Sequence, residues 1–359
     1  MDIDANRRRI DELDREIVRL LNERAECAVR IGQAKDKEDR PAFAPGRERQ
    51  VLEQVAAANG GPLKDENVQA IYREVMSACR ALERRMTVAY WGPPASNTHV
   101  AARRRFGSGV QYLETGSIAE TFQQVERGNA DLGVVPVENS TEGVIAQTLD
   151  RFLNGDLRIC AEIYVPIQHN LLSNAPSLDQ VKRVYTMFQA TAQCREWLTR
   201  NLGHVQLVDT TTTARGAALA AEDPETGAIA NSAAAEEYGV NILAEHIEDN
   251  PRNRTRFWVV GRIQPPPSGK DKTSILFSVP HRPGALVRAL DAFASNGVSL
   301  TFIESRPTKQ TPWEYVFFVD AAGHPDEGPD APLARALASL QEECAFVRVL
   351  GSYPESEDA

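Results

Sequence analysis

The sequence predicts a multidomain protein in which an all-α segment precedes a two-lobed α/β segment and a small α+β segment. At about 100–200 residues per domain, a chain of 359 residues is too long for one ordinary core. Residues 1–86 carry helical periodicity, whereas short apolar runs alternate with helical ones from residue 87 to 262. A proline-rich stretch at 263–271 reads as a linker, so we expect the last domain at 272–354.

Composition narrows the class of protein. The 42% hydrophobic and 25% charged fractions are typical of a soluble globular protein, and the net charge of -10 argues against general nucleic-acid binding. Five cysteines without a C-x-x-C pair indicate reduced thiols. The charged amino terminus lacks a signal peptide's apolar core, and no run approaches the ~18 apolar residues of a membrane span. We therefore expect a cytoplasmic protein with no membrane partner, cofactor or metal.

The first segment begins with a long predicted helix, Asn6–Lys35. A seven-residue grid places Arg7, Arg24 and Lys35 on the same stripe as the apolar residues, where buried cations need anions. About 30 residues at ~1.5 Å each give ~45 Å, which is too long for a lone domain of this size but fits a dimer of interlocked helices. A solvated charged face is the competing interpretation, because long cationic side chains can reach water from such a stripe.

Two more predicted helices follow, with breaks at "RPAFAPG" and "NGGP". Arg47 and Glu48 open the second helix, and Cys79 and Glu83 lie four residues apart on one face of the third. From periodicity alone, Glu83 is more simply a surface acid. Residues 5–86 resemble the helical chorismate mutase family through "RRRIDELDREIVRLLNERAECAVRIGQAK" and "PGRERQVL".

That resemblance implies an entwined dimer and a site for chorismate, a dianion that rearranges to prephenate in one pericyclic step. No nucleophile is needed, because the enzyme holds the reactive conformer and places donors on the breaking ether oxygen. Lys35 and Glu83 match the two donors, and Ala44 replaces an acidic residue that is common in the family. The implied substrate contacts are Arg7, reaching into the partner's site, with Arg24, Arg47, Glu48 and Cys79.

The middle segment contains "DLGVVPVENSTEG", an apolar run that ends in amides and hydroxyls. We expect largely parallel sheets, whose ligand sites lie at the carboxyl ends of strands, and about 175 residues suggest two lobes around a cleft. Asn, Ser, Thr and Gly after a strand are also ordinary turn and cap residues, so this pattern alone does not establish a site.

Residues 87–262 resemble the prephenate dehydratase family, whose two lobes are of the periplasmic-binding-protein kind. The motifs are "VAYWGP", "HVAA", "DLGVVPVENSTEG", "QHNLL", "AQC" and "NRTRF". Prephenate loses carbon dioxide and hydroxide together, which hydroxyls and amides can assist without a strong nucleophile. The resemblance implies Thr255 as donor to the leaving hydroxyl, Asn139, Ser140, Gln193 and Thr186 as positioning groups, and Arg256 as a carboxylate partner.

The middle segment departs from the family in two places. Ala95 stands where the family's Gly-Thr-Phe-Ser-His stretch begins, and Met187-Phe188 replaces a His-Pro pair. These departures leave a second interpretation open, in which the chain is a chorismate mutase whose dehydratase-like lobes only bind a ligand.

The last segment reads β, α, β, β, α, β, the order of the ferredoxin-like split unit, and could be a passive dimerisation module. It resembles an ACT domain through "PGALVRAL" and "IESRP". The resemblance implies an allosteric L-phenylalanine site between two such domains, and a helix amino terminus would suit the carboxylate of that amino acid. The implied residues are Gly284, Ala285, Leu286, Glu304, Ser305, Arg306 and Pro307.

Taken together, the three motif sets occur in the order of the bifunctional family that joins both activities in L-phenylalanine biosynthesis. The resemblance implies conversion of chorismate to prephenate and then to phenylpyruvate, feedback inhibition by L-phenylalanine, and a homodimer or higher oligomer. A transported-solute binder and a DNA-binding regulator are disfavoured, the first by the missing signal peptide and the second by net charge.

Overall fold

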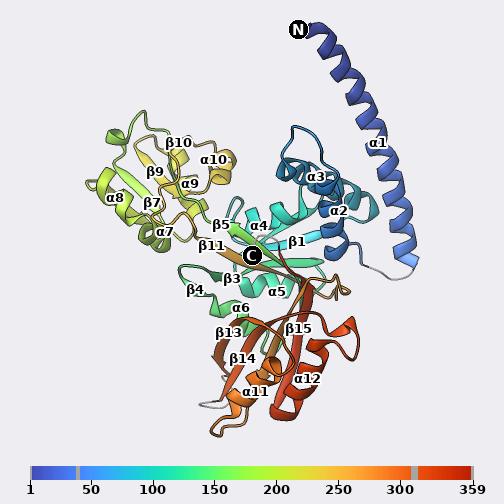
Figure 1. Ribbon diagram of the computed structural model, residues 1–359. Helices are drawn as coiled ribbons and strands as arrows, with labels where there is room; N and C mark the ends of the chain where they lie inside the picture. The colour runs from blue at the N-terminus through green and yellow to red at the C-terminus, as the bar shows by residue number, and fades with distance from the viewer. Residues whose placement is uncertain (1, 38–40, 309–313, 357–359) are drawn as a thin grey trace. The chain divides into compact units, whose positions relative to one another are not determined.

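A computed structural model describes residues 2–37, 41–308 and 314–356 (Figure 1). The chain divides into two compact units. The first contains the chain up to Thr87 together with Arg105–Gln111, and the second contains Val88–Arg104 and everything from Tyr112 onward.

The first unit is helical, as the sequence predicts. Its helices up to Thr87 are α1 (Ile3–Lys37), α2 (Pro45–Ala57) and α3 (Asp65–Glu83). Pro45 begins α2 at a position where the missing N–H costs nothing, and α3 packs against both other helices. The predicted break at 59–62 lies between α2 and α3. Of the break at 40–46, residues 41–44 precede α2, and Pro45 and Gly46 form its first turn.

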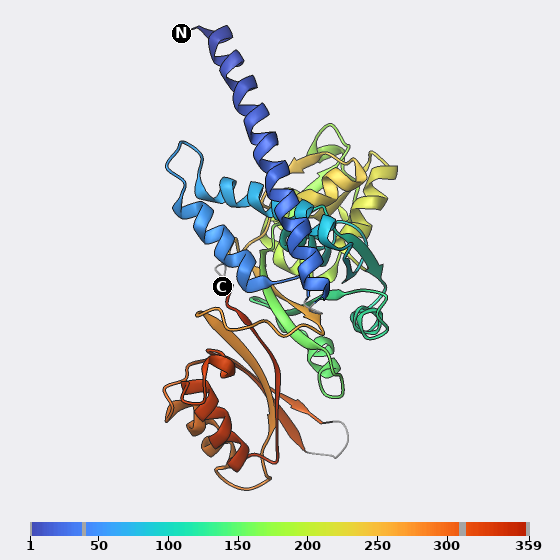
Figure 2. The same ribbon diagram turned by 90° about the vertical axis from the view of Figure 1, so that its right-hand side faces the viewer.

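Helix α1 is far longer than its partners and projects beyond them in both views (Figures 1 and 2). Its 35 residues span about 52 Å at ~1.5 Å per residue. Ile10, Ile17 and Val18 are each more than half exposed, at 56%, 53% and 57%. The helix therefore carries an apolar stripe that the described residues of this chain leave exposed.

The second unit contains three sheets. The first lobe has strand order β2-β1-β3-β11-β5, with β4 paired to β3. Its elements are β1 (Thr87–Trp91), α4 (Asn97–Phe106), β2 (Gln111–Thr115), α5 (Ile118–Glu126), β3 (Leu132–Asn139), β4 (Gly143–Val144), α6 (Ala146–Arg151), β5 (Arg158–Pro166) and β11 (Arg254–Gly261).

The second lobe has strand order β10-β6-β9-β7-β8. Its elements are β6 (Asn170–Ser173), η1 (Leu178–Gln180), β7 (Arg183–Thr186), α7 (Phe188–Gln193), α8 (Arg195–Asn201), β8 (Gln206–Asp209), α9 (Thr213–Glu222), β9 (Thr226–Ala230), α10 (Ser232–Tyr238) and β10 (Ile242–Ala244).

Both lobes have mixed sheets, so the expectation of largely parallel sheets was wrong. Strand β1 runs parallel to β3, and β7 runs parallel to β8 and β9. Strand β11, however, returns from the second lobe and inserts antiparallel between β3 and β5. This direction places the first residues of β11 beside the last residues of β3, with Thr255 opposite Asn139.

The third sheet, with order β13-β14-β12-β15, has the predicted ferredoxin-like topology. Helices α11 and α12 lie side by side on one face of it (Figure 2). Its elements are β12 (Asp271–Ser278), α11 (Ala285–Ala294), β13 (Leu300–Pro307), β14 (Tyr315–Ala322), η2 (Pro325–Glu327), α12 (Pro332–Glu343) and β15 (Phe346–Pro354).

The third sheet and the first lobe share one hydrophobic core. Phe318 and Leu350 from the third sheet belong to the same buried cluster as Phe122 and Trp258 from the first lobe. Strands β15 and β5 approach closely, because a Cβ on Gly351 would lie 2.1 Å from the carbonyl oxygen of Ile159. Across the described helices, none combines the length and apolar content needed to cross a membrane.

Candidate active sites

The facing sides of α1 and α3 bring together four residues that the sequence predicted. Lys35 Nζ lies 3.0 Å from Glu83 Oε2, and Arg24 Nη1 lies 3.0 Å from Cys79 Sγ. Gly32 permits this close approach, since a Cβ there would lie 3.0 Å from Cβ of Glu83. A cation and a carboxyl group thus face each other on a partly buried helix interface.

Arg7 and Arg47 do not join this group. Arg7 is exposed near the start of α1 and lies 3.6 Å from Asp4. It precedes Arg24 by 17 residues, or about 26 Å along a helix at ~1.5 Å per residue. Arg47 is exposed and bonds to Gln50 of its own helix at 3.4 Å. One chain therefore does not assemble the whole predicted chorismate site.

Glu48 was predicted to contact the substrate, but in the structure it is paired with two arginines. Its side chain is buried, and its carboxylate lies 2.6 Å from Arg80 Nη2 and 3.2 Å from Arg105 Nη2. Burial of a carboxylate requires such partners. Neither arginine was predicted from the sequence, although Arg80 directly follows Cys79 on α3.

Between the lobes of the second unit lies a pocket of about 440 Å³, which we call the interlobe pocket. Polar groups converge on it from the end of β3, the start of β11 and helix α7. Its lining includes Trp91, Ser96, Asn97, Thr98, Asn139, Glu142, His169, Met187, Gln193, Thr211, Thr212, Thr213, Thr255 and Phe257.

The amide of Asn139 has its orientation fixed by the backbone. Its Oδ1 accepts hydrogen bonds from the N–H groups of Thr141, at 2.9 Å, and Glu142, at 3.0 Å. Its Nδ2 must then face the other way, donating to Thr255 Oγ1 and to Asn253 Oδ1, both at 2.9 Å. The hydroxyl of Thr255 is therefore an acceptor toward Asn139, which leaves its own proton available to the pocket.

A chain of hydrogen bonds continues from this point into the second lobe. Asn253 Nδ2 donates to Gln193 Oε1 at 3.0 Å, and Gln193 Nε2 donates to Glu142 Oε1 at 3.2 Å. His169 Nε2 lies 2.8 Å from the same Gln193 Oε1. Because an amide oxygen can only accept a hydrogen bond, Nε2 is the nitrogen that carries the ring proton. Burial lowers the pKa of His169, which keeps this ring neutral.

Asn253 and His169 were missed by the sequence analysis, although each lies in a motif that it quoted. Asn253 opens "NRTRF", and His169 is the second residue of "QHNLL". Their position in those motifs was the available signal. The run Thr211–Thr213 also lines the pocket and had drawn no prediction.

Two predicted positioning groups are not among the residues that line the interlobe pocket. Ser140 is exposed, and its Oγ accepts a hydrogen bond from the N–H of Arg254 at 3.0 Å. Thr186 is buried and accepts a hydrogen bond from Thr191 Oγ1 at 3.2 Å. Of the Met187-Phe188 departure, Met187 lines the pocket and Phe188 is 74% exposed.

Arg256 requires a correction, because it does not reach the interlobe pocket. Its side chain leaves β11 on the face opposite Thr255 and is 4% exposed. The guanidinium lies 2.8 Å from Glu162 on β5 and 2.6 Å from Asp320 on β14, and it donates to Tyr353 Oη at 3.1 Å. The two carboxylates that pair with Arg256 both belong to the protein, so this side chain contributes to packing between the sheets.

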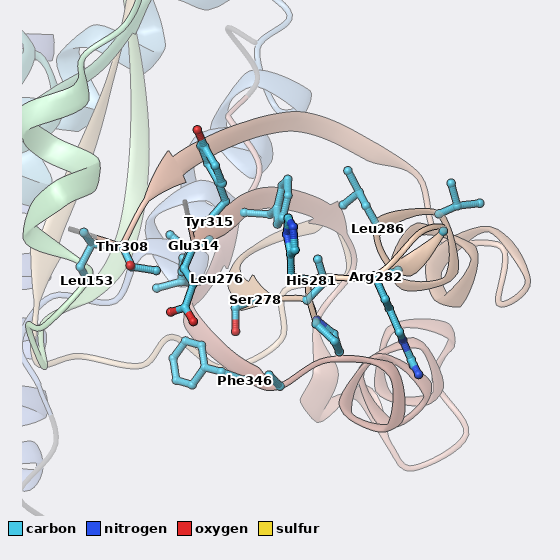
Figure 3. Close-up of a pocket in the computed structure, with 18 of the residues that line it drawn as sticks. Leu153, Leu276, Ser278, His281, Arg282, Leu286, Thr308, Glu314, Tyr315 and Phe346 are labelled. Carbon is cyan, nitrogen blue, oxygen red and sulfur yellow. The ribbon is translucent and has the colours of Figure 1, made fainter. Parts of the chain in front are cut away.

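A second pocket, of about 570 Å³, lies against the start of α11, and we call it the α11 pocket (Figure 3). The predicted residues Gly284, Ala285 and Leu286 line it. Figure 3 shows apolar and aromatic side chains from several strands around the same space. The labelled members are Leu153, Leu276, Ser278, His281, Arg282, Leu286, Thr308, Glu314, Tyr315 and Phe346.

The "IESRP" motif forms part of β13, an edge strand of the third sheet, and its residues are not among those that line the α11 pocket. Ser305 and Pro307 are exposed, whereas Glu304 and Arg306 are half-buried. Arg306 Nη2 lies 3.1 Å from Asp150 Oδ1 on α6. Within one chain, the "IESRP" residues therefore do not join Gly284, Ala285 and Leu286 in the α11 pocket.

Three family models match the chain in sequence order: chorismate mutase type II over residues 6–84, prephenate dehydratase over 88–265, and ACT domain over 273–338. A bifunctional chorismate mutase/prephenate dehydratase from Aquifex aeolicus is 47% identical over 354 residues, covering 98% of this chain and 97% of that protein. The chain belongs to the bifunctional chorismate mutase/prephenate dehydratase family.

Solved structures extend the likeness to the fold. A prephenate dehydratase from Arthrobacter aurescens, in complex with L-Phe, is 37% identical with a TM-score of 0.70, and the match covers 76% of this chain and 91% of that one. GqqA, described as a novel type of quorum-quenching acylase, is 33% identical with a TM-score of 0.68, covering 76% of this chain and 98% of that one.

Proposed function

We propose that this chain converts chorismate to prephenate and prephenate to phenylpyruvate, and that L-phenylalanine inhibits it. The observation that carries the proposal is the hydroxyl of Thr255, whose proton is left available by the fixed amide of Asn139. All five cysteines are free thiols, which supports our placing the enzyme in the cytoplasm. We also propose the domain boundaries expected from the sequence, with the chorismate mutase domain at 1–86, the prephenate dehydratase domain at 87–262, a linker at 263–271 and the ACT domain at 272–354.

For the mutase step, Lys35 and Glu83 are the proposed donors to the breaking ether oxygen. Lys35 Nζ donates to Glu83 Oε2 at 3.0 Å, so both side chains reach one point on the α1–α3 interface. A substrate oxygen at that point could accept from Lys35, and from Glu83 when its carboxyl group is protonated. Arg24, with Cys79 beside it, supplies a cation for a substrate carboxylate on the same interface. The rearrangement then needs only positioning and electrostatic stabilisation.

The mutase proposal includes a homodimer. Arg7 lies about 26 Å from Arg24 along α1, so a second chain has to bring its own Arg7 to this site. The exposed apolar stripe of α1 supports such an assembly, because large uncovered apolar surfaces mark interaction sites. We keep Arg47 as a substrate contact and assign Glu48 first to the ion pairs that hold Arg80 and Arg105.

For the dehydratase step, Thr255 is the proposed donor to the departing hydroxyl. The bond from the ring carbon to its carboxylate breaks, its electron pair enters the ring as carbon dioxide forms, and the carbon–oxygen bond to the hydroxyl breaks. The hydroxyl leaves as hydroxide, which the hydroxyl of Thr255 stabilises by a hydrogen bond and which solvent then protonates. Gln193 has both amide atoms held by neighbours and so offers a fixed surface to the substrate. The positioning roles of Ser140 and Thr186, which do not line the interlobe pocket, stay predictions.

The lining of the interlobe pocket suits decarboxylation. Of its described lining residues, none is Lys or Arg, and the polar ones are mainly hydroxyls and amides. A carboxylate held there receives hydrogen bonds without an opposing full charge. Weak stabilisation of the carboxylate favours its loss as carbon dioxide, since the charge moves into the ring and out with the hydroxide.

For regulation, we propose that L-phenylalanine binds in the α11 pocket. The first turn of α11, a ten-residue helix, presents backbone N–H groups that suit a carboxylate. Leu276, Tyr315 and Phe346 offer apolar contacts for an aromatic ring, and Glu314 offers a carboxylate for the ammonium group. The roles of Glu304, Ser305 and Pro307 on β13 stay predictions.

The test is chromatographic product analysis after incubation with chorismate, with and without L-phenylalanine, sampled before any acid treatment. Phenylpyruvate that L-phenylalanine suppresses supports the whole proposal. Prephenate that accumulates and stays would leave the alternative of a mutase with a ligand-binding module. Thr255→Val should abolish phenylpyruvate while prephenate still forms, because this change keeps the side-chain shape and removes the hydroxyl.

A further inference from the structure

The segment of residues 145–154, which contains α6, has its two ends in different pockets. Ile145, Ala146 and Gln147 line the interlobe pocket, and Leu153 and Asn154 line the α11 pocket. Six helical residues span only about 9 Å at ~1.5 Å per residue, so the connection is short. Figure 3 shows Leu153 at the edge of the α11 pocket, near Thr308.

One face of this segment is tied to strand β3, which ends in Asn139. The N–H of Ile145 donates to the carbonyl oxygen of Val137 at 2.7 Å. The buried hydroxyl of Thr148 donates to the carbonyl oxygen of Pro136 at 2.5 Å. A displacement of α6 would therefore pull on the strand that holds the amide of Asn139 against Thr255.

The other face of the segment lies in the core that the first lobe shares with the third sheet, where Phe152 packs edge-on against Phe122 and Trp258 of the first lobe. Leu149 and Phe152 are fully buried in the cluster that also contains Val316 and Phe318 of β14. Arg306 on β13 adds a charged contact, with Nη2 at 3.1 Å and Nε at 3.3 Å from Asp150 Oδ1. These two side chains are 21% and 22% exposed, so the ion pair is partly screened by water.

We propose that residues 145–154 couple the α11 pocket to the interlobe pocket, with Leu153 as a contact to the bound amino acid and the Asp150–Arg306 pair as the contact that moves α6. This inference rests on the proposed inhibition by L-phenylalanine. A ligand that binds one position of α6 better than another shifts the population of that position, and the geometry around Asn139 shifts with it.

The first experiment compares Asp150→Asn with the unaltered enzyme. L-phenylalanine binding is measured by calorimetry, and the dehydratase rate at saturating L-phenylalanine is divided by the uninhibited rate of the same protein. We expect normal binding, an uninhibited rate within about twofold of the unaltered enzyme, and a residual rate raised about 2- to 5-fold, as loss of a partly exposed pair predicts. Arg183→Gln is the matched control, since Arg183 pairs with Asp223 at the same 3.1 Å in the second lobe.

Two further variants separate the parts of the inference. Leu153→Ala should raise the dissociation constant of L-phenylalanine about 3- to 10-fold through lost apolar contact. Asp150→Arg should weaken inhibition more than Asp150→Asn, and addition of Arg306→Asp in the same chain should restore it. Restored inhibition in the double variant can be measured even if one of the single variants folds poorly.

The outcomes distinguish this inference from the function on which it rests. If L-phenylalanine neither binds nor inhibits the unaltered enzyme, the proposed regulation fails and the inference fails with it. If it inhibits the unaltered enzyme and Asp150→Asn equally, the coupling role is overturned and the regulation stands. An unchanged dissociation constant in Leu153→Ala would remove Leu153 from the ligand site.

Discussion

Replacing Asn139 by an aspartate is the sharpest test of the dehydratase mechanism, because it changes one atom of the hydrogen-bond chain and keeps the side-chain shape. The backbone N–H groups of Thr141 and Glu142 would still hold one carboxylate oxygen. The other oxygen would replace Nδ2, 2.9 Å from Thr255 Oγ1. The hydroxyl of Thr255 would then have to donate its proton to the new carboxylate, and that proton would no longer be available to the substrate.

The size of the effect follows from what that proton does. A positioned proton donor contributes about 10²- to 10⁴-fold to a rate, or about 2.7–5.4 kcal/mol of activation free energy. We therefore expect the kcat of Asn139→Asp for prephenate to fall at least about 100-fold, as far as that of Thr255→Val. The new negative charge also repels the dianionic substrate, but that repulsion raises KM.

The assay measures phenylpyruvate formation from prephenate, with mutase activity as the internal control for folding. The double variant Asn139→Asp with Thr255→Val decides the mechanism, because two changes that remove the same proton should not multiply. A double variant that is about 100-fold slower than either single one would refute the shared-proton argument. So would a single Asn139→Asp variant with nearly normal kcat.

Three further predictions concern other parts of the chain. Glu83→Gln should retain mutase activity, because an amide N–H can donate the hydrogen bond proposed for Glu83; initial rates with chorismate check this. Gly351→Ala should destabilise the second unit by about 1–3 kcal/mol in urea denaturation, since its Cβ would overlap the Ile159 carbonyl. Burial lowers the pKa of both His99 and His169, so the unfolded chain binds more protons in acid, and the free energy of unfolding should fall below about pH 6.5 by up to about 1.4 kcal/mol per pH unit for each. Substituting either histidine by Gln should reduce that slope.

The order of elements could be predicted from the sequence because it depends on local periodicity. The three helices of the first unit and the β-α-β-β-α-β order of the last segment follow from patterns within about ten or twenty residues. Strand direction in the lobes could not be predicted in this way. It depends on where β11 inserts, and its partners β3 and β5 are about 90–120 residues earlier in the chain.

The interlobe site was predictable in part. Thr255, Asn139 and Gln193 were predicted, and they do converge on one pocket. Asn253 and His169 were not, because their importance lies in the residues that they touch. Asn253 joins Asn139 to Gln193, and these three residues come from three separate segments of the chain. No spacing in the sequence encodes such a bridge before the segments are folded together.

The motif that contains Arg256 combines a residue that lines the interlobe pocket with one that is buried between two sheets. In "NRTRF", neighbouring residues of a strand must point to opposite faces, so Thr255 and Arg256 cannot both enter one pocket. The buried charges around Arg256 balance, with Glu162 and Asp320 opposing Arg256 and Lys272. Removing one member would leave a buried charge uncompensated, at a cost of about 3–5 kcal/mol.

That balance changes what a loss of activity at Arg256 would mean. The cluster joins β5 and β11 of the first lobe to β12 and β14 of the third sheet, directly behind the strand that presents Thr255. A variant at Arg256 would lose dehydratase activity because the two sheets come apart, with the unfolding free energy falling in parallel. A variant at Thr255 would lose the same activity with the unfolding free energy nearly unchanged. Measurements of stability therefore separate the packing role of Arg256 from the proposed proton-donor role of Thr255, although both residues belong to the same five-residue motif.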